Sequence, residues 1–129
     1  MKEFCRKWKW LLATSAAIIV ISLIPIPEKA PLDDVPFIDK WVHFVMYGAI
    51  VFAAWFDAVR NKTERISAWF ILAVFLYSSL LGGFMELLQG LTPYRSCDSL
   101  DFYADVFGAL LASAVVSVVA CLHRGRRPS

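Results

Sequence analysis

The sequence predicts an all-α integral membrane protein: four transmembrane helices in one bundle, with the N and C termini in the cytoplasm. Two observations support this prediction, the distribution of the apolar residues and the placement of the basic ones. Of the 129 residues, 59% are hydrophobic and the mean hydropathy is +0.60, whereas soluble domains are about 45–50% apolar. The apolar residues form long runs between short charged segments, which is typical of a chain that crosses a bilayer.

The apolar runs predict the helices. A helix rises about 1.5 Å per residue, so about 20 residues cross a hydrocarbon core of about 30 Å. The expected helices cover residues 10–27, 39–59, 66–91 and 100–122. The first run is the shortest, but no small-residue cleavage site follows it, so we expect an uncleaved helix rather than a signal peptide. Residues 1–129 are expected to form a single membrane domain.

The basic residues set the expected orientation. Ten of the 13 Lys and Arg residues lie in the N-terminal segment, in the connection at residues 60–65 and in the C-terminal segment. Basic segments of membrane proteins face the cytoplasm, so the first and third connections are expected to face outward. Because topology accounts for these basic segments, we expect no nucleic-acid partner.

Polar residues inside the apolar runs are the candidate functional residues, because a charge within a membrane helix costs a few kcal/mol. They are Asp39, Lys40 and His43 in the helix 39–59, Glu86 and Gln89 in the helix 66–91, and Asp101 and Asp105 in the helix 100–122. Successive helices run in opposite directions, so all three sets fall near the outward-facing end. Glu86, for example, is expected at a depth of roughly 9 Å. The sequence therefore predicts an outward-facing polar pocket between these three helices.

Simpler structural roles stand beside this prediction. Asp39 and Asp98 are possible helix N-caps. A buried imidazole at His43 can donate a hydrogen bond to Asp39 or to Glu86. Glu86 and Arg95 can form a buried ion pair that holds the helices together without doing chemistry.

Small residues predict where the helices approach closely. Ala104, Gly108 and Ala112 recur at a spacing of four in the last helix, and Ser79 and Gly83 do so in the helix before it. Small residues at this spacing let the backbones of membrane helices come together. We interpret these positions as packing surfaces.

Three segments resemble the motifs of the VanZ-like family: DKWVHFVMYG, GGFMELLQG and RSCDSLDFYADVFGALL. That family shows an Asp-Lys-x-x-His start to one helix, a Glu-x-x-Gln at the end of the next, and then an Arg. Its last helix carries an Asp and, four residues on, an Asn before a Gly. The resemblance covers about residues 37–115 and falls on Asp39, Lys40, His43, Glu86, Gln89, Arg95, Asp101, Asp105 and Gly108. Asp105 stands at the usual Asn position and adds a potential negative charge to the pocket.

The resemblance implies a multi-pass protein of the bacterial inner membrane and of the cell envelope. The namesake of the family is associated with resistance to teicoplanin, a glycopeptide antibiotic. The resemblance thus implies a phenotype and names no reaction. The expected partners are the lipid bilayer and an envelope lipid or glycopeptide-type ligand.

We favour a non-catalytic protein whose outer pocket binds such a ligand. Lys40 and Arg95 are suited to anionic groups, and Arg can bind a phosphate through two hydrogen bonds. Two alternatives stay open. The first is a small intramembrane enzyme, acid–base or metal-dependent, built on His43, Glu86, Asp101 and Asp105. No residue spacing matches a known metal motif, so we expect no metal site and no cofactor. The second is a structural or assembly role, and the sequence leaves the oligomeric state open.

Overall fold

The computed structural model describes residues 1–25, 36–62, 66–93 and 98–124, and within them the chain is helical apart from short turns. The helices are α1 (Lys2–Lys7), α2 (Lys9–Leu23), α3 (Ile38–Arg60), α4 (Ala68–Gly90) and α5 (Ser99–Arg124). Three of them, α3, α4 and α5, are long and apolar enough to cross a membrane. The prediction of an all-helical membrane protein is therefore confirmed.

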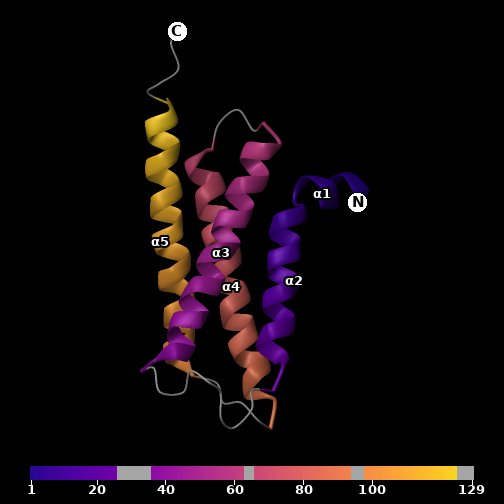
Figure 1. Cartoon of the computed structure of the whole chain (residues 1–129), viewed down its shortest axis with the longest axis vertical. Coiled ribbons are helices and arrows are strands. Elements are labelled where there is room, and N and C mark those ends of the chain that lie inside the picture. The colour runs from indigo at the N-terminus through magenta and orange to yellow at the C-terminus, as the bar shows by residue number, and fades with distance from the viewer. Residues whose placement is uncertain (26–35, 63–65, 94–97, 125–129) are drawn as a thin grey trace.

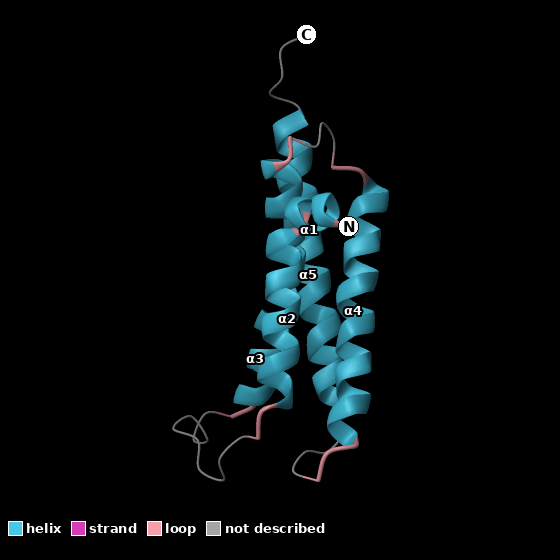
Figure 2. Ribbon diagram, turned by 90° about the vertical axis from the view of Figure 1, so that its right-hand side faces the viewer, coloured by secondary structure: helices cyan, strands magenta, loops and turns pink. Residues whose placement is uncertain are grey.

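The four longer helices, α2 to α5, lie side by side as one bundle, and the short α1 projects sideways from the N-terminal end of α2 (Figures 1 and 2). The helix α3 has its most extensive contacts with α5. At one end of the bundle α2 and α4 finish while α3 and α5 begin (Figure 1). We call this the polar end, and α1 and the C-terminal end of α5 lie at the opposite end.

The first long helix is shorter than predicted. It was expected to cover residues 10–27 but ends at Leu23, because Ile24 is extended, with φ −74° and ψ 132°. The pyrrolidine ring of Pro25 disfavours helical backbone in the residue before it. At 15 residues, α2 rises about 22 Å, less than the hydrocarbon thickness of about 30 Å. A fourth span therefore stays a prediction.

The other helices lie close to their predicted positions. The helix α3 covers Ile38–Arg60 instead of 39–59, and α5 covers Ser99–Arg124 instead of 100–122. The helix α4 begins at Ala68 instead of residue 66, because the Ser67 side chain caps it by accepting a hydrogen bond from Phe70 N at 3.1 Å. Its last residue is Gly90 rather than residue 91.

The helices α3 and α5 cross at glycines. A Cβ added to Gly48 would lie 3.2 Å from Gly108 O, and a Cβ added to Gly108 would overlap the carbonyl oxygen of Phe44. Ala112, one turn after Gly108, is only 3% exposed. On α4, however, the buried small residues are Ser78 and Gly82, whereas the predicted Ser79 and Gly83 are each half-buried. The α3–α5 crossing sets how closely the polar residues of the two helices approach.

A buried carboxylate joins α3 to α2 at the opposite end of the bundle. Asp57 is 1% exposed, and its Oδ2 accepts hydrogen bonds from Trp10 N and Leu11 N, each at 2.9 Å. These N–H groups belong to the first turn of α2, where they have no partner within the helix. Asp57 thus caps α2 from a neighbouring helix, as the α2 N-cap residue, Trp8, makes no side-chain cap.

Asp57→Ala is expected to lower the free energy of unfolding by about 1 kcal/mol, the usual cost of losing an N-cap acceptor. Thermal denaturation of the purified protein in detergent measures the loss. Asp57→Asn is the matched control, because its amide oxygen still accepts from Trp10 N and Leu11 N. If the Ala variant is as stable as the Asn variant, the cap contributes nothing.

Candidate functional site

Polar side chains from three helices meet at the polar end of the bundle. We call this group the polar cluster, and its members are Asp39, Lys40, His43, Glu86, Asp98, Asp101 and Asp105. Six of the eight predicted site residues belong to it, although α3, α4 and α5 carry them far apart in sequence. The remaining two, Gln89 and Arg95, do not belong to the described cluster.

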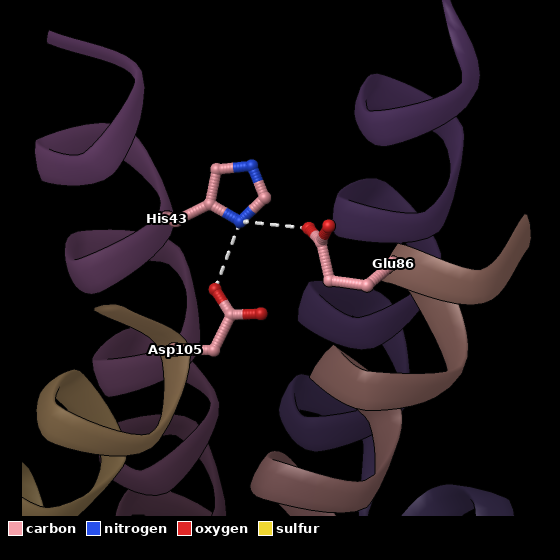
Figure 3. A group of neighbouring side chains, drawn as sticks. All are labelled: His43, Glu86 and Asp105. Carbon is pink, nitrogen blue, oxygen red and sulfur yellow. Dashed lines mark hydrogen bonds and ion pairs between the residues drawn. The ribbon is translucent and has the colours of Figure 1, made fainter. Parts of the chain in front are cut away.

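His43 lies at the centre of the buried part of the cluster. Its Nδ1 is hydrogen-bonded to Asp105 Oδ1 at 2.9 Å and lies 3.8 Å from Glu86 Oε1 (Figure 3). Its Nε2 lies 3.9 Å from Asp101 Oδ2. The side chains of His43 and Glu86 are each 4% exposed and that of Asp105 is 0% exposed. The sequence suggested Asp39 or Glu86 as the hydrogen-bond partner of His43, but the structure assigns Asp105.

Lys40 forms the second, more exposed part of the cluster. Its Nζ lies 2.7 Å from Asp39 Oδ2, 2.6 Å from Asp98 Oδ2 and 2.7 Å from Asp101 Oδ1. An ammonium group has three N–H donors, and three carboxylates surround this one. This geometry does not favour the predicted role of Lys40 in binding an anionic ligand.

Asp98 connects the two parts. Its Oδ1 accepts from Leu100 N at 2.9 Å, and its own backbone N–H donates to Glu86 Oε2 at 3.1 Å. The N-cap role suggested for Asp98 is therefore confirmed. The bond to the Lys40 ammonium holds the pKa of the Asp98 carboxyl below its usual value. Asp39, in contrast, is no N-cap: Phe37 takes that position with a left-handed φ of 57°, and Asp39 lies inside the first turn of α3.

Gln89 and Arg95 were predicted in the same pocket. Gln89 is 1% exposed and its Nε2 donates to the backbone oxygen of Ser22 at 2.9 Å. It therefore ties α4 to the end of α2, away from His43. Arg95, and with it the proposed Glu86–Arg95 pair, lies outside the described residues.

Two neighbours of the buried part are not among the eight predicted site residues, although the spacing of four places one of them, Tyr47, on the same helix face as His43. The ring of Tyr47, one turn after His43, stacks on the imidazole with 6.3 Å between the ring centres and is 0% exposed. Gly82 on α4 faces Asp105: an added Cβ would lie 2.6 Å from Asp105 Oδ2. In the sequence, the adjacent Gly82 and Gly83 were the signal for this contact. The Asp105 carboxylate can approach the backbone of α4 here because Gly82 has no side chain.

A groove of about 610 Å³ runs between α4 and α5. We call it the α4–α5 groove. Its walls are mainly apolar, and Glu86 and Asp98 lie among its lining residues, so it adjoins the polar cluster. The lining residues are Leu76, Ser79, Leu80, Gly83, Phe84, Glu86, Leu87, Asp98, Ser99 and Phe102. Its volume lies within the range of about 300–1,000 Å³ that is usual for ligand sites.

The described cluster carries more negative than positive groups. Five carboxylates face one ammonium and one imidazole. Such a site suits cations and hydrogen-bond donors. Two sets of three side chains have the mutual spacing to hold a metal ion: Asp39 with Asp98 and Asp101, and His43 with Glu86 and Asp105. Lys40 already occupies the first set.

Comparisons with known proteins were made on the whole chain. A family model described as VanZ/LLP1 matches residues 4–120. The match includes every described member of the polar cluster and both walls of the α4–α5 groove. No curated protein and no solved structure matches the chain.

Proposed function

Because the chain belongs to the VanZ/LLP1 family, we propose that it binds an envelope lipid in the α4–α5 groove, with the lipid headgroup at the polar cluster. It is a VanZ-like membrane protein with three helices of membrane-spanning length. The observation that carries the proposal is the groove itself, whose mainly apolar walls include two carboxylate residues, Glu86 and Asp98.

The proposed placement is the bacterial inner membrane, as one domain with four spans. In this arrangement α2 is the fourth span, since it lies alongside α3 with Ser15, Ile18 and Ser22 buried. The basic residues of α1 and the end of α3 at Arg60 lie at the same end of the bundle (Figure 1). The positive-inside rule supports a cytoplasmic location for that end and an outward-facing polar end.

The walls of the groove suit a lipid tail. Leu80 is 72% exposed, Leu87 66% and Phe84 56% on the surface of a helix long enough to span the bilayer. Such side chains face hydrocarbon, so an acyl chain can enter the groove sideways from the bilayer. Lipid, rather than a soluble ligand, is therefore the occupant that this surface favours.

The polar end of the groove selects the headgroup. Glu86 and Asp98 line the groove, and carboxylate oxygens accept hydrogen bonds, whereas Lys40 is already paired with carboxylates. A headgroup that donates through hydroxyl or ammonium groups fits this end better than a bare phosphate does. A glycopeptide-type ligand with the same donors is the alternative, and a contribution to teicoplanin resistance is part of the proposal.

Gly83→Leu tests lipid binding, because a side chain at Gly83 projects into the groove beside Phe102, 3.2 Å from the Cβ position. Protein is reconstituted into nanodiscs made of total bacterial envelope lipid, released into detergent and analysed by native mass spectrometry. We expect the wild type to retain one lipid per chain and Gly83→Leu to retain about tenfold less, the effect of losing one or two buried methylene contacts.

Ala73→Leu is the control, since it adds apolar bulk to an exposed position of α4 outside the groove. Equal lipid retention by Gly83→Leu and Ala73→Leu would contradict the proposal. The proposed contribution to teicoplanin resistance is tested separately. The inhibitory concentration of teicoplanin is measured for a susceptible bacterium that expresses the wild type or Gly83→Leu. Lipid retention without a change in that concentration would confine the function to lipid binding.

A further inference from the structure

Three side chains of the polar cluster converge on one point in the interior of the bundle. His43 on α3, Glu86 on α4 and Asp105 on α5 each offer a ligand atom, and these atoms lie within 4.8 Å of one another (Figure 3). We propose that these three residues bind one divalent metal ion of the Zn²⁺ and Mn²⁺ class. An imidazole nitrogen with two carboxylate oxygens is a donor set that both ions accept.

The spacing of the ligand atoms fits such an ion. Ligands at about 2.0–2.2 Å from a metal in tetrahedral or octahedral geometry are about 3.0–3.5 Å apart. The distance from His43 Nδ1 to Asp105 Oδ1 is 2.9 Å, and that to Glu86 Oε1 is 3.8 Å. The His43–Asp105 distance is close to this range, the His43–Glu86 distance exceeds it by a few tenths of an ångström, and no two of the three ligand atoms are more than 4.8 Å apart.

One oxygen of each of the two carboxylates lacks a hydrogen-bond donor. Glu86 Oε1 and Asp105 Oδ2 are buried and accept no hydrogen bond. Unpaired carboxylate oxygens in the interior are costly, so a cation between them is favourable. In the described part of the chain, the ion pairs of Glu86 and Asp105 involve His43, while Lys40 is bound to Asp39, Asp98 and Asp101.

The surroundings of His43 resemble the outer shell of a metal site. A histidine ligand usually directs its second ring nitrogen to a carboxylate, which fixes the tautomer and the ring orientation. His43 Nε2 faces Asp101 Oδ2 at 3.9 Å, on the side away from Asp105. The stacked ring of Tyr47 further restricts the imidazole. Glu86 also lines the α4–α5 groove, so an ion here can be reached from the groove.

The test is metal binding by the full chain in detergent, without a histidine tag. The protein is stripped with a chelator and titrated with Zn²⁺ or Mn²⁺, and bound metal is measured by elemental mass spectrometry. Co²⁺ serves as a spectroscopic probe, since its visible absorption reports nitrogen and oxygen ligands. We expect one ion per chain, and at least about tenfold weaker binding by Glu86→Gln and by Asp105→Asn.

Asp57→Asn is the matched control, because Asp57 is a buried carboxylate of α3 at the opposite end of the bundle. It is expected to bind metal as the wild type does. Absence of stoichiometric metal in the wild type would overturn the proposal, and so would equal binding by all four proteins. If Asp105→Asn fails to fold, Glu86→Gln alone decides between these results. Gly83→Leu should still bind the ion, which separates this inference from lipid binding.

Discussion

Gly108→Ala is expected to destabilise the protein by about 3 kcal/mol, the upper end of the usual cost of overpacking. The added Cβ would overlap the Phe44 carbonyl oxygen and lie 2.8 Å from the Phe44 carbonyl carbon. Both atoms belong to the backbone of α3, so no side-chain rotation relieves the contact. The helices α3 and α5 must separate, and thermal denaturation in detergent measures the cost.

Gly83→Ala is the matched control on α4. Its Cβ would lie 3.2 Å from the ring of Phe102, a half-buried side chain that can shift. Because Ala favours a helix over Gly by about 1 kcal/mol, we expect this variant to be as stable as the wild type or slightly more so. Equal losses in the two variants would contradict the close α3–α5 crossing.

The same substitution at Gly108 should weaken the site. Gly108 follows Asp105 by three residues on α5, and Phe44 follows His43 on α3. Moving the two helices apart at this level lengthens the 2.9 Å contact between His43 Nδ1 and Asp105 Oδ1. Loss of metal binding in Gly108→Ala, together with its retention in Gly83→Ala, is therefore the expected pattern.

The long helices and the depth of their polar residues follow from the sequence. Hydrophobic length alone identifies α3, α4 and α5, since each has more than 20 mostly apolar residues. The alternating directions of successive helices bring Asp39, Glu86 and Asp101 to one end. These inferences need only the rise per residue and the order of the elements.

The pairing within the cluster does not follow from the sequence. His43 bonds to Asp105 because α3 and α5 approach closely at Gly48 and Gly108, and Asp105 fits because Gly82 leaves room on α4. Periodicity places a residue on a face of its own helix but does not fix the rotation of that helix against its neighbours. The backbone donors that bond to Asp57 depend in the same way on α2 lying beside α3.

The expectation of no metal site rested on sequence spacing. Known metal motifs place two or more ligands within a few residues of one another, so that a pattern can be recognised. The three residues that we propose as ligands, His43, Glu86 and Asp105, come from three different helices. A set of this kind leaves no short motif and becomes visible only once the helices are packed.

Lys40→Met is expected to destabilise the protein at neutral pH by about 2 kcal/mol, between the values for exposed and for buried ion pairs. Lys40 is the one described cation that Asp39, Asp98 and Asp101 share. Its side chain is 20% exposed and that of Asp101 is 10% exposed, so solvent screens the pair only in part. Without it, the three carboxylates repel one another. Met keeps the apolar part of the lysine side chain. Lys2→Met is the control, because Lys2 is exposed and lies in α1, outside the polar cluster.

The pH dependence separates this charge effect from a packing effect. Lys40 holds the pKa of Asp98 below its ordinary value of 3.8. A lowered carboxyl pKa contributes stability that is complete above the ordinary value and is lost as the pH falls through the lowered one. The difference between wild type and Lys40→Met should therefore be constant between about pH 7 and pH 5 and become smaller as the pH falls below 3.8. A difference that stays the same at pH 3 would show that lost packing, and not lost charge, destabilises the variant.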